Sequence, residues 1–207
     1  MKMRHPTEIF EEWAENGKDI GMEKSHAISV DQMISFAMEE RTDIGKNFSF
    51  LDLGCGSGWV ARKVAKEDLC SRAVGIDGAA QMIVNAKSRG GNEEYIHADI
   101  NYFSPVSKYD LIHSMEVLYY LEDPSNIIKR ISDSWLNKDG RLIAGIDLYY
   151  ENTDSHSWQE KVGTPMHMLK ESQWVEIFKL AGLREVKAWR INKHEGWEGT
   201  LVLTGIK

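Results

Sequence analysis

Three glycines alternate with other residues directly after an apolar segment. Gly54, Gly56 and Gly58 follow the segment Phe48–Leu53, and Trp59 then begins a helical pattern. Glycine lets the backbone turn sharply and approach a ligand closely, and the N-terminus of the following helix offers free N–H groups and a positive dipole. Several classes of nucleotide-binding protein share such a loop, and an incidental tight turn has the same form. The spacing predicts a nucleotide-like ligand without choosing among these classes.

Two aspartates follow the next two β-rich segments and narrow this choice. Asp77 lies 19 residues after Gly58 at the end of Ala73–Asp77, and Asp99 ends the segment Glu94–Asp99. An acid at the first position accepts hydrogen bonds from ribose hydroxyls in dinucleotide sites. An acid at the second position would lie where an adenine amino group is bound. Either aspartate alone suits a helix N-cap, but their joint placement favours a nucleoside site.

The elements that must position these residues alternate between strands and helices, which predicts an α/β fold with a parallel sheet covered on both faces. The expected strands are Phe48–Leu53, Ala73–Asp77, Glu94–Asp99, Tyr109–Met115, Arg141–Asp147, Leu183–Trp189 and Thr200–Ile206. The expected helices are Thr7–Glu15, Val30–Glu40, Trp59–Lys66, Ala79–Ser88, Asp123–Leu136 and Glu171–Leu180.

Two segments outside this alternation are expected to surround the site within one domain, residues 1–207. Residues 1–45 form an N-terminal helical cap, with Trp13 and Met22 near the ligand. Residues 148–170 carry no regular pattern and are interpreted as a lid, because long structureless loops in compact domains are usually functional. Trp158 lies in this lid, whereas Trp135 and Trp174 lie on helical faces and are expected in the core.

The chain resembles the class I S-adenosylmethionine-dependent methyltransferases, particularly those that act on small molecules. The resemblance rests on residues 51–58 (LDLGCGSG), 75–83 (GIDGAAQMI), 97–100 (HADI), 109–112 (YDLI) and 136–142 (LNKDGRL). It implies a Rossmann-like three-layer sandwich with a seven-stranded, mostly parallel sheet. The last strand, Thr200–Ile206, would insert antiparallel between its neighbours.

The resemblance also implies S-adenosyl-L-methionine as cofactor and a role for each matching residue. The amino-acid end would be held by the glycine loop, the ribose by Asp77 and Gly78, and the amino group of the adenine by Asp99. The full set of implied cofactor-binding residues is Asp52, Gly54, Cys55, Gly56, Asp77, Gly78, Met82, Asp99, Ile100, Ser114, Met115 and Leu118. A nicotinamide-dependent dehydrogenase is less favoured, because Trp59 occupies the position where that fingerprint needs a small residue.

Methyl transfer from a sulfonium is an in-line displacement in which the protein supplies alignment, so no fixed acid–base motif is expected. A hydroxyl, thiol or ammonium acceptor needs a base, and histidine titrates in the useful range. The catalytic candidates are His26, His156, His167 and Tyr119. His113 lies inside a strand, where a packed, hydrogen-bonded histidine is the favoured interpretation. Glu116 and Asp147 are interpreted as caps or polar pocket groups, and no metal site is expected.

Composition limits the partners of the molecule. The 25 basic residues against 32 acidic residues give a net charge of −7, which disfavours nucleic acid and anionic membranes as partners. Two cysteines and the absence of an apolar leader or membrane-spanning segment favour a cytoplasmic protein. We therefore expect methyl transfer to a small-molecule acceptor. A protein side chain as acceptor, or a protein that binds the cofactor without transferring the methyl group, remain the alternatives.

Overall fold

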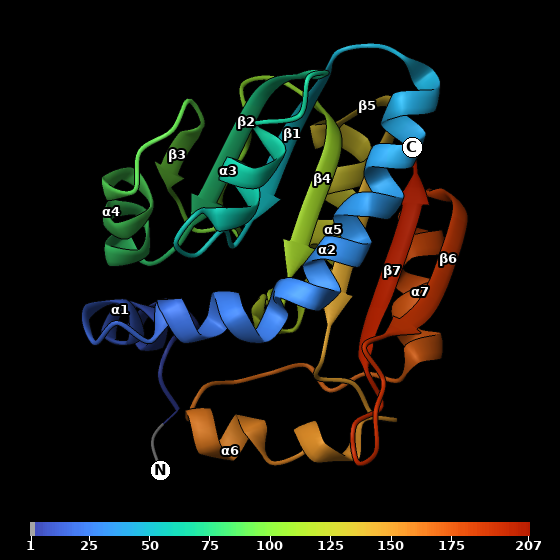
Figure 1. Cartoon of the computed structure of the whole chain (residues 1–207). Helices are drawn as coiled ribbons and strands as arrows, with labels where there is room; N and C mark the ends of the chain where they lie inside the picture. The colour runs from blue at the N-terminus through green and yellow to red at the C-terminus, as the bar shows by residue number, and fades with distance from the viewer. Residues whose placement is uncertain (1–2) are drawn as a thin grey trace.

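A seven-stranded sheet with the order β3-β2-β1-β4-β5-β7-β6 forms the centre of the computed structural model, which describes residues 3–207 (Figure 1). The strands are β1 (Phe48–Leu53), β2 (Cys70–Asp77), β3 (Glu94–His97), β4 (Tyr109–Met115), β5 (Leu136–Ile146), β6 (Arg184–Ile191) and β7 (Thr200–Ile206). β1 to β5 pair in parallel, and β7 lies antiparallel between β5 and β6. The expected Rossmann-like sheet and its inserted last strand are confirmed.

Helices cover both faces of this sheet. They are α1 (Pro6–Glu15), α2 (Asp19–Ile44), α3 (Trp59–Val64), α4 (Ala80–Ser88), α5 (Pro124–Arg130), α6 (Trp158–Val162) and α7 (Glu171–Leu180). Three short helical turns are also present among the described residues: η1 (Leu118–Tyr120), η2 (Ile131–Trp135) and η3 (Thr153–Ser155). Gly182 follows α7 with φ +84°. In Figure 1, α2 and α3 lie on one face of the sheet, and α5 and α7 lie on the other.

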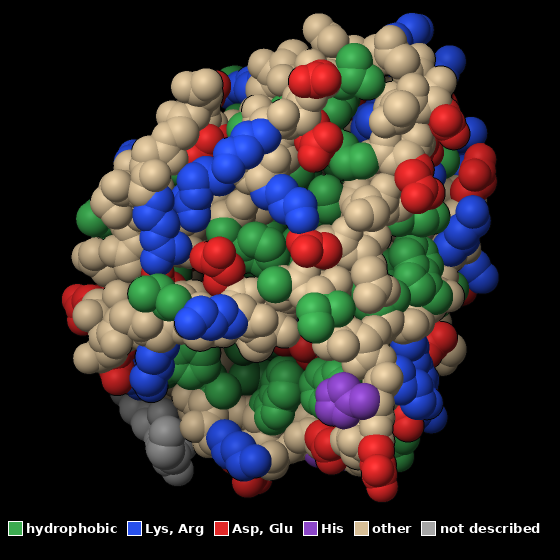
Figure 2. All heavy atoms as spheres, viewed as in Figure 1, with side chains coloured by type: hydrophobic (Ala, Val, Ile, Leu, Met, Phe, Trp, Pro, Cys, Tyr) green, Lys and Arg blue, Asp and Glu red, His purple; other side chains and the backbone are tan. Residues whose placement is uncertain are grey.

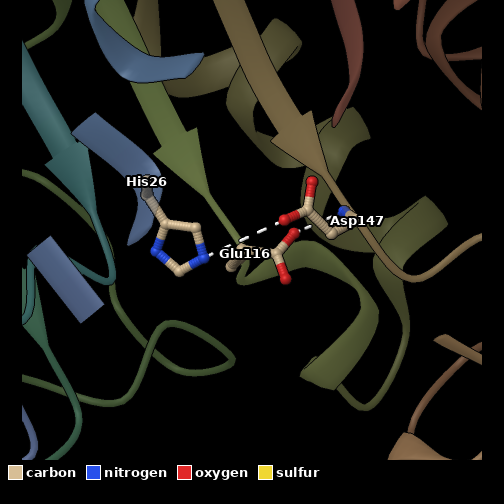
Figure 3. Close-up of side chains that lie close together, drawn as sticks. All are labelled: His26, Glu116 and Asp147. Carbon is tan, nitrogen blue, oxygen red and sulfur yellow. Dashed lines mark hydrogen bonds and ion pairs between the residues drawn. The ribbon is translucent and has the colours of Figure 1, made fainter. Parts of the chain in front are cut away.

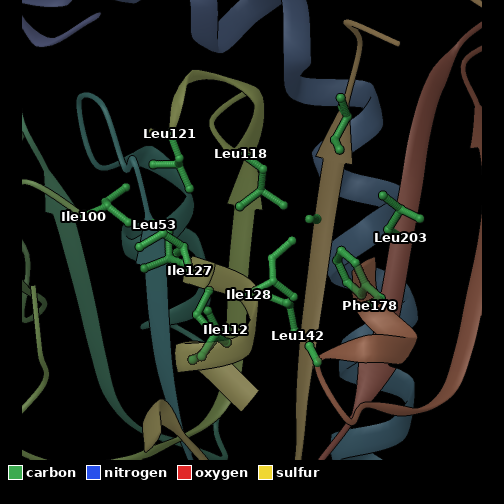
Figure 4. Packing of buried hydrophobic residues seen from close by; sticks show 14 of the residues in the cluster. Leu53, Ile100, Ile112, Leu118, Leu121, Ile127, Ile128, Leu142, Phe178 and Leu203 are labelled. Atoms are coloured by element: carbon green, nitrogen blue, oxygen red, sulfur yellow. The ribbon is translucent and has the colours of Figure 1, made fainter. Parts of the chain in front are cut away.

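Two apolar clusters fill the space between the sheet and its helices. One joins β-strand residues such as Ile112 and Leu142 to Ile128 of α5 and Phe178 of α7, as Figure 4 shows. The second packs α2, α3 and α4 on the opposite face, with Phe50 of β1 at its centre. Trp135 and Trp174 are 1% and 0% exposed and belong to the first cluster. Their predicted core positions are confirmed.

The second helix is longer than its apolar pattern indicates. Val30–Glu40 was the expected range because Val30, Met33, Ile34 and Ala37 share one face, and these residues do pack on the sheet. The helix nevertheless begins at Asp19. Its first turns lie across the carboxyl ends of β1 and β4 rather than on a sheet face, so no apolar stripe marks them (Figure 1). The first two residues of the predicted cap 1–45 lie outside the described residues.

The predicted helix Asp123–Leu136 is present, but it is not α-helical throughout. It is α5 up to Arg130 and then the π-helical turn η2 up to Trp135. Leu136 already pairs with Tyr109 of β4, and the pairing then skips forward to Leu111 and Arg141. The intervening residues bulge, with Asp139 at φ +61°. A local irregularity in pairing therefore moves the start of β5 ahead of its apolar run.

The segment 148–170 is a packed part of the molecule rather than a structureless lid. It contains η3 and α6, and Leu148 and Tyr149 at its start are 0% exposed. Tyr149 Oη donates a 2.9 Å hydrogen bond to the Gly199 carbonyl. The segment also holds the N-terminus: Arg4 N donates to the Gly163 carbonyl and Thr164 Oγ1 donates to the Arg4 carbonyl, both at 2.9 Å.

Among the described residues, none of the helices combines the length and apolar character that crossing a membrane requires.

Candidate active site

A cavity opens at the carboxyl ends of β1, β2 and β4, beneath α1 and the first half of α2. This edge of a parallel sheet is where ligands of open α/β folds bind. The register places Asp52 of β1 level with Gly75 of β2 and His113 of β4, so the three strands end together. Figure 2 shows hydrophobic side chains gathered between the N-terminal helices and α6. The cavity lining includes His5, Thr7, Phe10, Asp19, Met22, Glu23, His26, Asp52, Gly54, Cys55, Gly56, Ser57, Trp59, Asp77, Gly78, Met82, Asp99, Ile100, Asn101, His113, Met115, Glu116, Val117, Tyr120 and Leu121.

The glycine loop forms one wall of this cavity. Gly54 has φ +68°, and a Cβ atom there would lie 2.2 Å from Cγ2 of Val117. Both the backbone conformation and the neighbouring side chain therefore require glycine. Gly56 has φ +51°, and its nearest neighbour in the Cβ direction is Met82 Sδ at 3.9 Å. The backbone at Gly56 consequently faces open space inside the cavity.

Asp77 ties the loop to the end of β2. Its two carboxylate oxygens accept hydrogen bonds from the backbone N–H groups of Gly56 at 2.9 Å and Ala79 at 2.8 Å. Burial raises the pKa of Asp77 to about 6, although these two N–H groups act in the opposite direction. Each carboxylate oxygen has a further lone pair, so Asp77 can also accept from a ligand hydroxyl.

Asp99 and two apolar residues form the next part of the wall. Oδ1 of Asp99 accepts from the backbone N–H and the side-chain amide of Asn101, each at 2.9 Å. Met82 and Ile100 line the cavity and are 1% and 6% exposed. Gly78 lies beneath the cap, because a Cβ there would come within 2.4 Å of Thr7 Cγ2. This region has the apolar walls and polar edge that a flat heterocycle needs.

Asp52 and His113 form a buried pair at the base of the cavity. His113 Nδ1 and Asp52 Oδ1 are hydrogen-bonded at 2.7 Å, and the residues are 0% and 2% exposed. The structure thus bears out a packed, hydrogen-bonded histidine, and it also places His113 in the cavity wall. Asp52 Oδ2 and His113 Nε2 are buried without hydrogen-bond partners among the described residues. Such atoms are rare in folded proteins and indicate a place for a bound polar group.

The end of β4 contributes differently from what the sequence suggests. Met115 lines the cavity, but Ser114 and Leu118 do not. Ser114 is 0% exposed, and its Oγ donates to the Leu53 carbonyl at 3.3 Å. Leu118 packs in the apolar core, because η1 turns it inward. Both assignments are corrected: these residues support the wall from behind.

At one end of the cavity, His26 and Glu116 of its lining meet Asp147, which lies behind that lining (Figure 3). His26 Nε2 lies 3.9 Å from Asp147 Oδ2. Oε1 of Glu116 accepts from the backbone N–H of Asp147. One ligand atom from each residue lies within 4.8 Å of the others, a combination that metal sites also use. Of the four catalytic candidates, only His26 lines the cavity.

The electrostatics of this cluster follow from burial. Burial, together with the negative charge of Asp147, raises the pKa of Glu116 well above its ordinary value. Burial raises the pKa of Asp147 to about 6 and lowers the pKa of His26. One oxygen of Asp147, Oδ1, is buried with no hydrogen-bond partner in residues 3–207. The cluster therefore contains two buried carboxyl groups, and His26 is the basic side chain beside them. Ionisation of both carboxyl groups is unfavourable without a further cation.

Tyr119 lies behind this cluster. Its Oη donates a 2.6 Å hydrogen bond to Glu116 Oε2, and the residue is 1% exposed. Tyr120 lines the cavity in its place and packs edge-to-face on Phe10, with ring centroids 5.2 Å apart. Tyr119 is therefore a residue that positions Glu116, not one that reaches the cavity.

The histidines of segment 148–170 lie away from the cavity. His156 Nε2 is 2.8 Å from the Tyr150 carbonyl, and His167 contacts Tyr119 only through its backbone N–H. Trp158 stacks on Trp197 at 6.1 Å, and Trp13 packs on Phe10 at 5.4 Å. None of these four residues lines the cavity. Their placement around the ligand is corrected. The segment 148–170 packs beneath the cap, and Trp13 of α1 lies behind Phe10, which lines the cavity in its place.

Four cavity residues were not expected to be central to the site: Glu116 was interpreted as a cap or polar pocket group, and Asp19, Glu23 and Val117 carry no motif. Glu116 has φ +59°, a conformation uncommon outside glycine, which turns its side chain into the cavity. No local pattern announces that conformation. Its position directly after β4 is the one signal that pointed to it, because this is where the sheet binds ligands.

Comparisons with known proteins identify a methyltransferase domain within the chain. A family model described as a methyltransferase domain matches residues 51–144. Malonyl-[acyl-carrier protein] O-methyltransferase 2 of Ilyobacter polytropus is 30% identical over 114 residues, which cover 52% of this chain and 44% of that protein. The chain matches only about half the length of the first such relatives.

Two solved structures share the fold. A putative methyltransferase of Haloferax volcanii, in a complex with the Trm112 methyltransferase activator, superimposes with a TM-score of 0.82 at 24% identity and 99% coverage of both chains. The N-methyltransferase NodS of Bradyrhizobium japonicum, in complex with S-adenosyl-l-homocysteine, gives a TM-score of 0.65 at 20% identity, with 86% of this chain and 84% of that chain covered. Residues 51–144 match a methyltransferase domain, and the fold and the glycine loop are those of the class I S-adenosylmethionine-dependent methyltransferases. The cofactor of this family is S-adenosyl-L-methionine.

Proposed function

We propose that this protein transfers the methyl group of S-adenosylmethionine to a small molecule that enters the same cavity. The observation that carries the proposal is the cavity itself, in which a glycine loop, Asp77 and Asp99 share one space with His26 and Glu116. Residues of α1 and of the first half of α2 cover this cavity above the strand ends. A covered cavity with apolar walls and a few polar groups is typical of small-ligand sites, which supports a small substrate.

The residues present suit this cofactor. The unpartnered Asp52 Oδ2 offers an acceptor to the ammonium group of its amino-acid end, next to the open backbone at Gly56. Asp77 is proposed to hold the ribose hydroxyls, and Asp99 the adenine amino group, with Met82 and Ile100 on either side of the ring. The bound cofactor supplies an electrophilic methyl carbon. The protein aligns the acceptor with it and excludes water.

Calorimetry with S-adenosylhomocysteine tests the cofactor assignment. We expect the purified chain to bind it, and Asp77→Ala to weaken binding at least about tenfold, since a hydrogen bond to a charged group contributes about 1.5–3 kcal/mol. Glu39→Gln on the exposed side of α2 is the control and should bind like the wild type. NAD⁺ should not bind. Equal affinity in the Asp77 variant would contradict the ribose assignment.

Transfer of a tritiated methyl group to a metabolite extract and to a protein extract then distinguishes the kinds of acceptor. Label in the small-molecule fraction supports the proposal, and label only in protein contradicts it. One arm includes the Trm112 protein of Haloferax volcanii, because that protein accompanies the structural neighbour. Transfer in that arm alone would show that the chain does not act by itself. Tight cofactor binding without transfer in any arm would indicate a binding protein.

A further inference from the structure

The charges that line the cavity are all of one sign. Six carboxylates reach it, from Asp19, Glu23, Asp52, Asp77, Asp99 and Glu116. Among the described residues, no lysine or arginine lines it. A carboxylate or phosphate acceptor would meet repulsion without a compensating cation. The charge of the cavity thus favours a neutral or cationic acceptor.

Most of these acids already have partners or belong to the proposed cofactor half. Asp19 and Glu23 face Arg89, at 2.7 and 3.8 Å. Glu116 and its neighbour Asp147 have no lysine or arginine partner among the described residues. The basic side chain near them is His26, which is paired with Asp147. Buried carboxylates without a counter-charge must take up a proton or a cationic ligand.

The size of the cluster allows room for one small cationic group. The His26–Asp147 separation is 3.9 Å, and the three ligand atoms lie within 4.8 Å of one another (Figure 3). Three acceptors around one ammonium nitrogen, each about 2.8 Å from it, lie about 4.6 Å apart. Ligands of a tetrahedral zinc ion, at about 2.1 Å, lie about 3.4 Å apart. The measured separation lies between these two spacings, so the cluster can hold an ammonium group or a metal ion, and the charge and the aromatic rings of the cavity favour the ammonium group.

Aromatic rings add a second, independent observation. Phe10 and Tyr120 line the cavity and pack against each other, and Tyr120 also contacts Tyr119, the hydrogen-bond partner of Glu116, with ring centroids 4.4 Å apart. Aromatic faces attract organic cations, at about 0.5–2 kcal/mol per contact. Carboxylates beside aromatic rings form a typical environment for an alkylammonium group.

We propose that the acceptor is a small primary or secondary amine, which binds as its ammonium ion to Glu116 and Asp147 and gives a proton to His26. This proposal rests on the proposed function and specifies its substrate class. The proton passes from the ammonium nitrogen to Nε2 of His26 and leaves a lone pair on the amine. That pair forms the new bond to the methyl carbon, while the electrons of the broken carbon–sulfur bond remain on sulfur and give S-adenosylhomocysteine.

Matched probes test the substrate class without knowledge of the natural acceptor. Benzylamine, benzyl alcohol and benzoate share a ring and differ in charge, as do cyclohexylamine, cyclohexanol and cyclohexanecarboxylate. Their binding to the chain saturated with S-adenosylhomocysteine is measured by ligand-observed NMR, and their methylation by mass spectrometry. We expect each amine to bind at least about tenfold more tightly than its alcohol, and no binding of the carboxylates.

Neutral variants test the residues. Glu116→Gln and Asp147→Asn should each weaken amine binding at least about tenfold, with unchanged affinity for S-adenosylhomocysteine. His26→Gln should lower the methylation rate much more than amine affinity. Glu39→Gln, the same charge change on the exposed side of α2, should alter none of these values. Circular dichroism shows whether each variant is folded. The relative affinities of the probes for the wild type do not depend on any variant, so a folding defect cannot affect them.

The outcomes distinguish failure of the amine assignment from failure of the proposed methyltransferase function. Methylation of alcohols or carboxylates in preference to amines overturns the amine assignment and leaves a small-molecule methyltransferase. Failure to bind S-adenosylhomocysteine overturns the proposed function itself. Mg²⁺, Mn²⁺ and Zn²⁺ are titrated alone: saturable binding that Glu116→Gln and Asp147→Asn abolish, with loss of activity in EDTA, would assign the cluster to a metal ion instead.

Discussion

The side chain of Asp147 is buried, and burial disfavours the charged form of its carboxyl group. Its pKa is raised to about 6, whereas an unfolded chain has an aspartate pKa of about 3.9. Between these values the folded protein binds a proton that the unfolded chain does not, so this residue lowers stability as pH rises from about 4 to about 6. Above that range the loss is complete.

Asp147→Asn should therefore stabilise the ligand-free protein at pH 8, by on the order of 3 kcal/mol, and have little effect at pH 4. Urea unfolding at both pH values measures this difference. Asp154→Asn, an exposed aspartate of the same segment, is the control and should change stability by less than about 0.5 kcal/mol. A destabilised or pH-independent Asp147→Asn variant would contradict the assignment. A residue that lowers stability yet strengthens ligand binding would have a functional role.

At the scale of elements, the cap closes on the strand ends through a contact between Thr7 of α1 and Gly78. An alanine at position 78 would bring its Cβ within 2.4 Å of Thr7 Cγ2. Gly78→Ala should displace α1, speed the dissociation of S-adenosylhomocysteine and raise the rate at which trypsin cleaves at Lys18, whose side chain is exposed but whose backbone lies between α1 and α2. Thr7→Ser removes the crowded methyl group and keeps the hydroxyl group. The double variant should recover wild-type values; a dissociation rate that stays fast would instead place the effect on the ligand itself.

The elements also show how far the sequence predicts the site. The glycine loop, Asp77 and Asp99 were identifiable because each stands at the end of a strand, and local spacing fixes that position. The packed structure of the segment 148–170 was not identifiable from the sequence. Its residues contact the sheet and Arg4, which are distant in sequence, and such contacts leave no periodic pattern of apolar residues. The conformation of Glu116 and the inward turn of Leu118 likewise depend on tertiary contacts.

At the scale of the whole molecule, α2 is joined to the middle of the sheet by a largely buried ion pair. Arg141 of β5, 5% exposed, donates from Nε to Glu40 Oε2 at 2.8 Å and from Nη2 to Oε1 at 2.5 Å. Its Nη1 donates to Thr204 Oγ1 of β7 at 2.8 Å. The pair thus connects the helix that carries His26 to the two strands beside it.

Glu40→Ala leaves the Arg141 guanidinium without its carboxylate and should lower the free energy of unfolding by about 2–4 kcal/mol. Chemical denaturation measures this loss. The exposed pair Lys129–Asp133, at 2.9 Å, provides the comparison, and Asp133→Ala should cost about 0–1 kcal/mol. Similar small losses in both variants would mean that water replaces the partner of Arg141.

Both backbone groups of Arg4 are hydrogen-bonded to the segment 148–170. Its N–H donates to the Gly163 carbonyl, and its carbonyl accepts from Thr164 Oγ1. These hydrogen bonds join residues up to 160 positions apart along the chain and fix the residue just before His5 and α1 to the segment 148–170. For the proposed methyltransferase, the residence time of a product beneath the cap would then depend in part on a segment whose histidines and Trp158 do not line the cavity.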